Sequence, residues 1–406
     1  MNIAVSIVGL AFLILIHEAG HFFVALAVRM RPRRFYIFFP PALVKRVRNG
    51  IEYGIGSIPL GGYVKIPGMH KPAAADLEAR FERAAEEAPW LLRHVAPVKA
   101  ELDAGRLAEA RAALPALRAA VERAELSDAA RKDAERAITD VDDGLAGDAY
   151  WRAPVWKRVA VILAGPGTNL VFAIALLAVV FMLGVPVDTT RRVERVATGT
   201  PAAAAGIRAG DKIVAIDGRP LGPREIAPTI RASEGRVLAL TVEREGERVV
   251  VSARARQSEG VYRLGFQLAA RYESYGPLAA TGLAAERTWL VTKAIGSALG
   301  RIVTGEGREE VASPVGIVQF SSETLDVGFR EFLGLLALIS LSLALLNLLP
   351  LLPLDGGHIA FSIAEGVRGR AIPREAYERA SAVGIVLVLF LFLIGLSNDI
   401  GRLRGG

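Results

Sequence analysis

The stretch IAVSIVGLAFLILIHEAGHFFVALAV, residues 3–28, decides how this chain must fold. It is long and apolar enough to cross a bilayer as a helix, which takes about 20 residues. Its only ionisable side chains are His17, Glu18 and His21. Such groups are costly at membrane depth, so they face a protein interior and usually carry function. Two histidines four residues apart share one helix face and can bind one zinc ion, with the glutamate placed to act on water. The stretch therefore predicts a metal site inside a membrane span.

Composition indicates a membrane protein with at least one soluble part. Hydrophobic residues make up 52 % of the 406 residues. There is no cysteine, which excludes disulfides and thiolate metal ligands, so a zinc site must use histidine and carboxylate. The five histidines are His17, His21, His70, His94 and His358. We interpret His70 and His94 as ordinary surface or interfacial residues, because neither has a partner at metal-ligand spacing.

Four apolar segments are predicted to span the membrane, at about residues 3–28, 159–183, 332–353 and 382–396. We expect the first to be a retained span, because a basic leader region and a cleavage site are missing. The net charge is +7, and the positions of the basic residues are more informative about membrane topology than the total. A basic cluster follows the first span and places that end in the cytoplasm, and further basic residues before the second span and between the last two agree.

This topology puts both termini, and the segment between the second and third spans, outside. His17 then lies roughly 21 Å from the outer end of its helix, nearer the cytoplasmic face. A basic cluster beside a membrane has this simple cause, so we expect no nucleic-acid binding.

The regions between the spans differ in character. Residues 34–70 are rich in glycine, β-branched and aromatic residues and predict short strands or a hairpin. This could be an ordinary surface hairpin, or a sheet edge near the metal that could pair with an extended peptide. Residues 73–150 have helical spacing, with a break expected near Pro115. Residues 190–270 predict a soluble β-rich domain, and residues 276–305 an amphipathic helix that returns to the membrane.

A third metal ligand is needed, because a hydrolytic zinc site has three protein ligands and one position open to water. The segment NLLPLLPLDGGHI, residues 347–359, has two prolines and two glycines that interrupt the third span. Irregular backbone at membrane depth is tolerated where it lines a cavity or is buried in protein. Asp355 stands at this break, at the predicted depth of His17 and His21. It is our candidate, with His358 as the alternative, and Asp355 could instead only cap the helix that follows.

Together these motifs resemble the site-two proteases, in the branch of bacterial intramembrane zinc metalloproteases that have a single PDZ domain. HEAGH is similar to the family's zinc motif, and NLLPLLPLDGG to its second motif, whose aspartate is the third ligand. The resemblance therefore favours Asp355 over His358.

Three further stretches carry the resemblance. IPLGGYVKIPG, residues 58–68, resembles a membrane-associated β-structure near the active site. AGPGTNL, residues 164–170, is similar to a Gly-Pro-x-x-Asn signature, and SPVGI, residues 313–317, to the segment before the third span. The β-rich domain looks like the PDZ domain of this branch. The helical insertion departs from the family pattern.

The expected fold is thus a polytopic α-helical membrane protein with about four transmembrane helices, a membrane-associated β-hairpin region, a cytoplasmic helical insertion and an inserted β-rich PDZ-like domain. The first half comprises transmembrane helix 1 with the zinc motif (1–30), the β region (31–72), the insertion (73–150) and transmembrane helix 2 (151–186). The second half comprises the extracytoplasmic PDZ-like domain (190–270), an amphipathic return segment (271–330), transmembrane helix 3 with the third ligand (331–366) and transmembrane helix 4 (380–398).

The resemblance implies that His17, His21 and Asp355 hold Zn²⁺ and that Glu18 is the catalytic base. Substrate contacts are expected at Gly61, Gly62, Tyr63 and Asn347. Asn347 could equally satisfy only a buried carbonyl, and for Asn169 we favour that structural role.

By resemblance, the substrates are single-span membrane proteins, either anti-sigma factors or remnant signal peptides, cleaved within the bilayer of the cell membrane. The PDZ-like domain could bind a peptide end or exclude substrates with bulky ectodomains. The first alternative is an inactive membrane-anchored PDZ scaffold with a structural metal site, against which Glu18 argues. The second alternative is a metal transporter. The single metal site and the PDZ-like domain argue against it.

Overall fold

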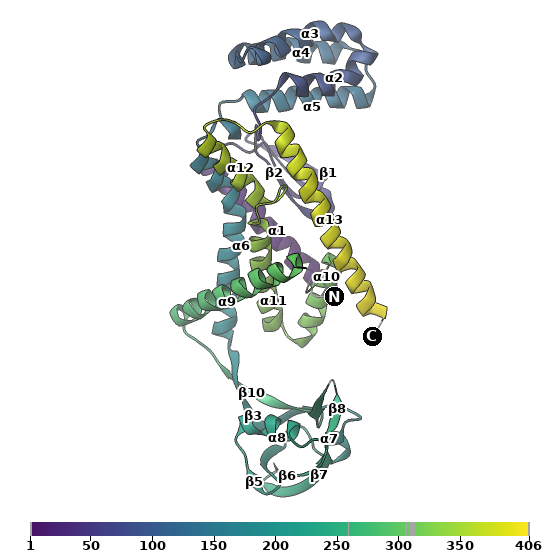
Figure 1. Ribbon diagram of the computed structural model, residues 1–406, viewed down its shortest axis with the longest axis vertical. Coiled ribbons are helices and arrows are strands. Elements are labelled where there is room, and N and C mark those ends of the chain that lie inside the picture. Colours follow the sequence, from purple (N-terminus) through teal and green to yellow (C-terminus); the bar gives the residue numbers. More distant parts are fainter. Residues whose placement is uncertain (1, 259, 305–306, 308–312, 405–406) are drawn as a thin grey trace. The chain divides into compact units, whose positions relative to one another are not determined.

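The computed structural model describes residues 2–258, 260–304, 307 and 313–404. The chain forms two compact units, one of Met1–Leu176 with Ala285–Gly406 and one of Leu177–Ala284. Four helices are long and apolar enough to cross a membrane, which confirms the four predicted spans. These are α1 (Asn2–Ala27), α6 (Val155–Leu183), α11 (Phe329–Asn347) and α13 (Arg374–Arg404), all labelled in Figure 1.

The third span is shorter than predicted. Helix α11 ends at Asn347, not near residue 353, and α12 (Asp355–Arg368) begins after a turn. Pro350 and Pro353 lack the N–H groups that a continuing helix would use, so the backbone between the two helices forms turns instead. Asp355 is therefore the first residue of a new helix and not part of a long interrupted one.

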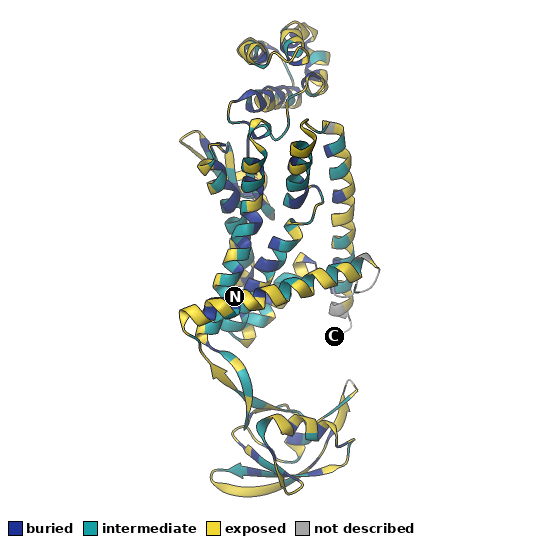
Figure 2. Cartoon of the chain, turned by 60° about the vertical axis from the view of Figure 1, so that its left-hand side comes forward, coloured by how far each residue is buried: buried dark blue, intermediate teal, exposed yellow. Residues whose placement is uncertain are grey.

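Helix α13 is longer than the predicted residues 382–396. Its first turns contain Tyr377, whose ring packs against the rings of His70 and Phe361, and these contacts extend the helix towards its N-terminus. Further along, large apolar residues of this helix, such as Val383, Leu389 and Phe390, are exposed. Figure 2 shows many exposed positions, in yellow, along the helix that ends at the C-terminus. Exposed apolar surface of this kind suits a helix in contact with lipid.

Residues 34–65 form an antiparallel hairpin, β1 (Arg34–Arg48) and β2 (Ile51–Lys65). Asn49 and Gly50 connect the strands with positive φ angles of 52° and 74°, the conformation that an Asn-Gly hairpin turn requires. The start of β1 pairs twice, because Phe35 lies opposite both Tyr53 and Val64. The two halves of β2 thus flank the same segment of β1, and the end of β2 forms one edge of the sheet.

Residues 74–145 form four helices with a core of their own. These are α2 (Ala74–Glu87), α3 (Leu92–Asp103), α4 (Leu107–Arg123) and α5 (Asp128–Leu145). Helix α2 packs on α5, and α3 on α4 (Figure 1). The predicted break at Pro115 is wrong, because α4 continues through it. Burial of Leu114 and Leu117 in this core outweighs the one hydrogen bond that proline removes.

The second unit is a β-rich domain, as expected. Its strands are β3 (Val185–Val196), β4 (Lys212–Ile216), β5 (Arg219–Pro220), β6 (Val237–Arg244), β7 (Glu247–Arg254), β8 (Arg256–Ser258), β9 (Val261–Arg263) and β10 (Phe266–Glu273). The main sheet has the order β10-β3-β4-β6-β7, with β5 beside β4. Two short helices, α7 (Pro201–Ala204) and α8 (Pro223–Arg231), complete it, and Ile213, Ile226 and Leu240 are fully buried in its core. Its PDZ-like nature stays a prediction.

The return segment contains two helices, α9 (Pro277–Val303) and α10 (Pro314–Val327). Residues 305–306 and 308–312 of the predicted segment lie outside the described residues. Helix α10 packs against α1. The α1 helix is therefore covered by protein along part of its length. The HEAGH motif, residues 17–21, thus belongs to a helix that packs inside a bundle.

Candidate metal centre

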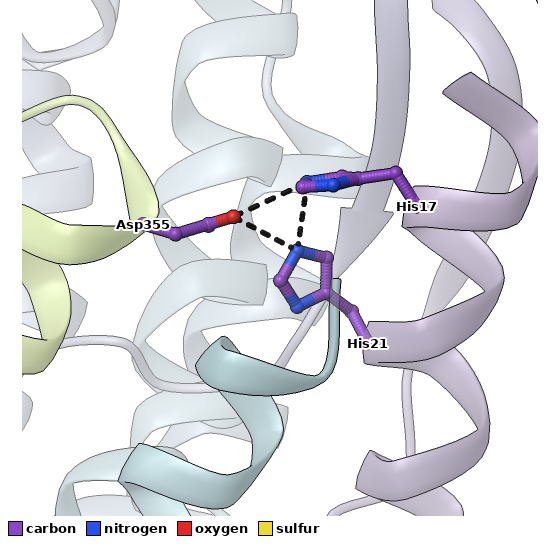
Figure 3. Close-up of side chains that lie close together, drawn as sticks. All are labelled: His17, His21 and Asp355. Carbon is purple, nitrogen blue, oxygen red and sulfur yellow. Dashed lines mark hydrogen bonds and ion pairs between the residues drawn. The ribbon is translucent and has the colours of Figure 1, made fainter. Parts of the chain in front are cut away.

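Three side chains from two distant parts of the sequence meet in the first unit. His17 and His21 project from α1, and Asp355 from the start of α12 (Figure 3). The two histidine Nε2 atoms lie 3.2 Å apart, and Asp355 Oδ2 lies 3.2 Å from Nε2 of His17 and 3.4 Å from Nε2 of His21. Within the part of the chain that the structure describes, this is the one group of three or more His, Cys, Asp or Glu residues that could hold a metal ion.

The triangle of ligand atoms has the size that zinc requires. A tetrahedral zinc ion with ligands at about 2.0–2.1 Å places its ligand atoms about 3.3 Å apart. Asp355 Oδ2 is also buried, and it lies within ion-pair distance of both imidazole nitrogens. A buried carboxylate is costly unless a cation is paired with it, and a metal ion between the three atoms would supply that cation. These residues therefore fit a divalent metal ion with nitrogen and oxygen ligands.

Two glycines bring Asp355 into place. A Cβ atom at Gly356 would overlap the backbone carbonyls of Leu348 and Leu349, and one at Gly357 would lie 2.5 Å from the nitrogen of Leu352. The chain between α11 and α12 can fold back this closely only because neither residue has a side chain. The two glycines of the DGG sequence, residues 355–357, thus allow a tight turn that places the Asp355 carboxylate next to the two imidazoles.

Glycines also bring α1 and α6 into backbone contact at the site. A Cβ atom at Gly20 would overlap Thr168 Oγ1 and the carbonyl of Ala164, and one at Gly165 would overlap Nε2 of His21. Small residues allow close helix approach in membranes, as here. Gly20 of HEAGH and Gly165 of AGPGTNL therefore have a common structural reason: they let the backbones of α1 and α6 approach closely beside the histidine rings.

Helix α6 also contributes a hydrogen bond to His21. The ring Nδ1 lies 2.8 Å from the carbonyl oxygen of Val161, and the side chain is buried. A carbonyl only accepts, so Nδ1 carries the proton and Nε2 presents its lone pair to the centre of the triangle. Sequence reasoning missed this contact, because a backbone carbonyl has no sequence signature.

Asn169 also lies at the site, which its interpretation as a purely structural residue did not anticipate. It is fully buried, and its amide Nδ2 lies 3.5 Å from Nδ1 of His17. A polar side chain in the middle of an apolar span was the signal in the sequence.

Strand β2 passes directly beside the motif glutamate. A Cβ atom at the buried Gly62 would overlap Cγ of Glu18. Gly61 instead faces the ring of Phe39, and Tyr63 lies opposite Tyr36 in the sheet. Of the three strand residues expected to contact substrate, Gly62 is the one placed against the motif.

The remaining candidates lie elsewhere. His358 follows Asp355 by one helical turn and is not part of the cluster. The rings of His70 and His94 pack against those of Tyr377 and Trp90, with centroids 4.6 and 5.9 Å apart. Asn347 is the half-buried last residue of α11, just before the turn that leads to Asp355.

The fold and the site together define a multi-pass membrane metalloprotease. A family model described as peptidase family M50 matches residues 5–391, so the chain belongs to that family and is a zinc metalloendopeptidase.

Full-length relatives agree with this assignment. The chain is 29 % identical to the regulator of sigma-E protease of Salmonella typhimurium, over 99 % of both chains. It is 28 % identical to a Rhizobium meliloti protein named provisionally as a zinc metalloprotease, over 98 % of this chain and 95 % of the relative. A similarly named protein of Lactococcus lactis is 27 % identical, over 98 % and 97 %.

Proposed function

We propose that this protein hydrolyses peptide bonds within the transmembrane segments of single-span membrane proteins, using Zn²⁺ held by His17, His21 and Asp355. The observation that carries the proposal is the triangle of two Nε2 atoms and one carboxylate oxygen, with sides of 3.2, 3.2 and 3.4 Å, formed inside a membrane helix bundle. Three protein ligands leave a fourth position for water, as in hydrolytic zinc sites.

Glu18 is the residue that moves the proton. Zn²⁺ bound at this position would supply a Lewis acid that lowers the pKa of water towards about 7 and polarises a carbonyl group. Glu18 follows His17 in α1 and lies against Gly62. It takes the proton from the attacking water and delivers it to the leaving amine. A structural metal site has no use for a base at this position, which disfavours the inactive scaffold.

The end of β2 is the proposed binding strand for the substrate. A helical substrate hides its peptide groups in its own hydrogen bonds and has to unwind before cleavage. Residues 62–65 pair with β1 on one side, and no described strand pairs with their other side. That edge can exchange the helical hydrogen bonds of the substrate for strand bonds. We assign substrate contact to Gly61, Gly62 and Tyr63 on this strand and to Asn347 beside the third ligand.

The proposed substrates are anti-sigma factors or remnant signal peptides. The relative named as a regulator of sigma-E protease supports the first class. The basic segment after α1 supports an active site near the cytoplasmic face of the cell membrane and a β-rich domain outside it. We propose that this domain is PDZ-like and binds a peptide end, and that the four-helix insertion is cytoplasmic.

The test is co-expression of the native chain or a Glu18→Gln variant with a panel of single-span proteins from the same genome. We expect cleavage products with the native chain and none with Glu18→Gln, while both purified proteins contain zinc. A scaffold would function equally in both forms, and a transporter would be barely affected. Equal cleavage by native and variant chains would remove the protease proposal.

A further inference from the structure

The side-chain amide of Asn169 has one atom without a hydrogen-bond partner at the site. Asn169 lies in α6, is fully buried, and points its Nδ2 at Nδ1 of His17, 3.5 Å away. Its Oδ1 is buried and has no hydrogen-bond partner among the described residues. A buried amide oxygen without a partner is costly and calls for an explanation.

The chemistry of His17 supplies the explanation. Nε2 of His17 is the atom that faces His21 and Asp355. To bind a cation there, Nε2 must present a lone pair, so the ring proton has to reside on Nδ1. Nδ1–H then points at the amide NH₂ of Asn169, and two donors face one another. The oxygen and nitrogen of a side-chain amide exchange places on a half-turn, and the hydrogen-bond network decides between the two orientations.

We propose that Asn169 is a positioning residue, whose Oδ1 accepts a hydrogen bond from Nδ1–H of His17 and thereby fixes the tautomer and orientation of that ring for metal binding. The inference rests on the proposed function, because it assumes a cation at Nε2. In this orientation Oδ1 of Asn169 has a donor, and Nδ1–H of His17 has an acceptor. His17 and His21 are then held in the same way, each by an oxygen acceptor on α6.

The surrounding packing makes the contact possible. Gly165 has no side chain between α6 and the two rings, where a Cβ atom would overlap Nε2 of His21. The carbonyl of Asn169 accepts a hydrogen bond of 2.9 Å from Oγ of Ser340, which is fully buried on α11. The backbone that carries the amide is thus tied to the helix that leads to Asp355. An acceptor held this firmly can orient a ring at little entropic cost.

The experiment compares zinc affinity in three variants of the full chain in detergent. Asn169→Leu removes the acceptor at similar volume, and Asn169→Asp keeps an oxygen facing His17. Ser6→Ala is the matched control, because Ser6 is a fully buried polar residue elsewhere in α1 whose Oγ has no described partner. Zinc dissociation constants come from chelator competition, and visible spectra of the cobalt-substituted proteins report ligand geometry.

We expect Asn169→Leu to weaken zinc binding by about 10- to 100-fold, the usual effect of losing such a partner, and to alter the cobalt spectrum. Asn169→Asp should stay within about threefold of the native protein, and so should Ser6→Ala. Zinc affinity of Asn169→Leu equal to that of the native chain would overturn the inference, as would equal losses in Asn169→Leu and Asn169→Asp.

One further measurement and the zinc affinity of the native chain keep the test decisive. Thermal unfolding of the metal-free variants identifies general misfolding, and if Asn169→Leu does not fold, the Asn169→Asp variant decides alone, since an acceptor role predicts that it binds zinc. A native chain that binds no zinc would contradict the proposed function itself. Tight binding by native and Leu variants alike would contradict only the role of Asn169.

Discussion

Gly165 on α6 lies so close to His21 on α1 that a Cβ atom on the glycine would overlap Nε2 of the ring. The proposed ligand atom is therefore in contact with the backbone of a neighbouring span. This contact connects helix packing directly to metal binding. A Gly165→Ala substitution, which adds one methyl group, tests the connection.

We expect Gly165→Ala to displace the His21 ring and to weaken zinc binding by about tenfold or more. Gly167→Ala is a matched control, because a Cβ atom there has no neighbour within 4 Å. Both changes favour the helix equally, so only the contact with the ring differs. Chelator competition on the purified proteins measures the effect. Equal affinities in the two variants would show that the ring can move aside without loss.

The contact between Gly62 and Glu18 predicts a separation of metal binding from catalysis. We expect Gly62→Ala to push β2 and Glu18 apart and to lower the cleavage rate by about tenfold or more, which is part of the roughly 100- to 10,000-fold that a general base contributes. Zinc content should not change, because the three atoms nearest to a Cβ atom at Gly62 all belong to Glu18 and none to the three clustered residues. Gly147→Ala, at a position open to solvent, is the control. Loss of zinc from Gly62→Ala would contradict this prediction.

The junction between the four-helix insertion and β1 should depend on pH. Both guanidinium nitrogens Nη1 and Nη2 of Arg33 bond to Asp148 at 3.0 Å, and Nε bonds to Asp143 at 2.9 Å. Burial alone would raise the pKa of Asp148, but the hydrogen bonds from Arg33 outweigh it and hold that pKa below its ordinary value. The carboxylate therefore stabilises the junction above its unfolded pKa of about 3.9, and this contribution is lost as pH falls through the lower folded pKa.

Limited proteolysis of the insertion measures this effect. Cleavage should be constant between about pH 7 and 5 and should accelerate below about pH 4. At neutral pH, Asp148→Asn should accelerate it by about fivefold, the factor for roughly 1 kcal/mol. Asp133→Asn is the control, because its ion pair with Arg83 is exposed and exposed pairs contribute little. Acceleration of the same size in the control would refute a specific role for Asp148.

Metal removal should loosen α12. The proposed ligands join α1 to the start of α12, so an ion that binds only the folded site adds stability. Chelation should lower the unfolding temperature and abolish cleavage, and added Zn²⁺ should restore both. Asp355→Asn weakens the site and should make the unfolding temperature insensitive to chelator. An unchanged unfolding temperature of the native chain after complete zinc removal would contradict this coupling.

Much of the fold and of the proposed ligand set was readable from local patterns. A helical spacing of four residues places His17 and His21 on one face wherever the helix lies. Apolar runs identified the four spans, and the glycine, β-branched and aromatic residues of 34–70 the hairpin, because each depends on the chemistry of a few neighbouring residues. The glycines after Asp355 indicated a break, although the end of α11 was placed too late.

Only the tertiary structure decided what surrounds those groups. The carbonyl of Val161 beside His21, the amide of Asn169 beside His17 and the backbone of Gly62 beside Glu18 belong to segments far away in the chain. Helix α4 likewise continues through Pro115 because of a core that its own residues do not define. Backbone carbonyls and missing side chains carry no chemical label in a sequence, so their roles emerge only when helix packing brings them within a few ångströms of an imidazole or a carboxylate.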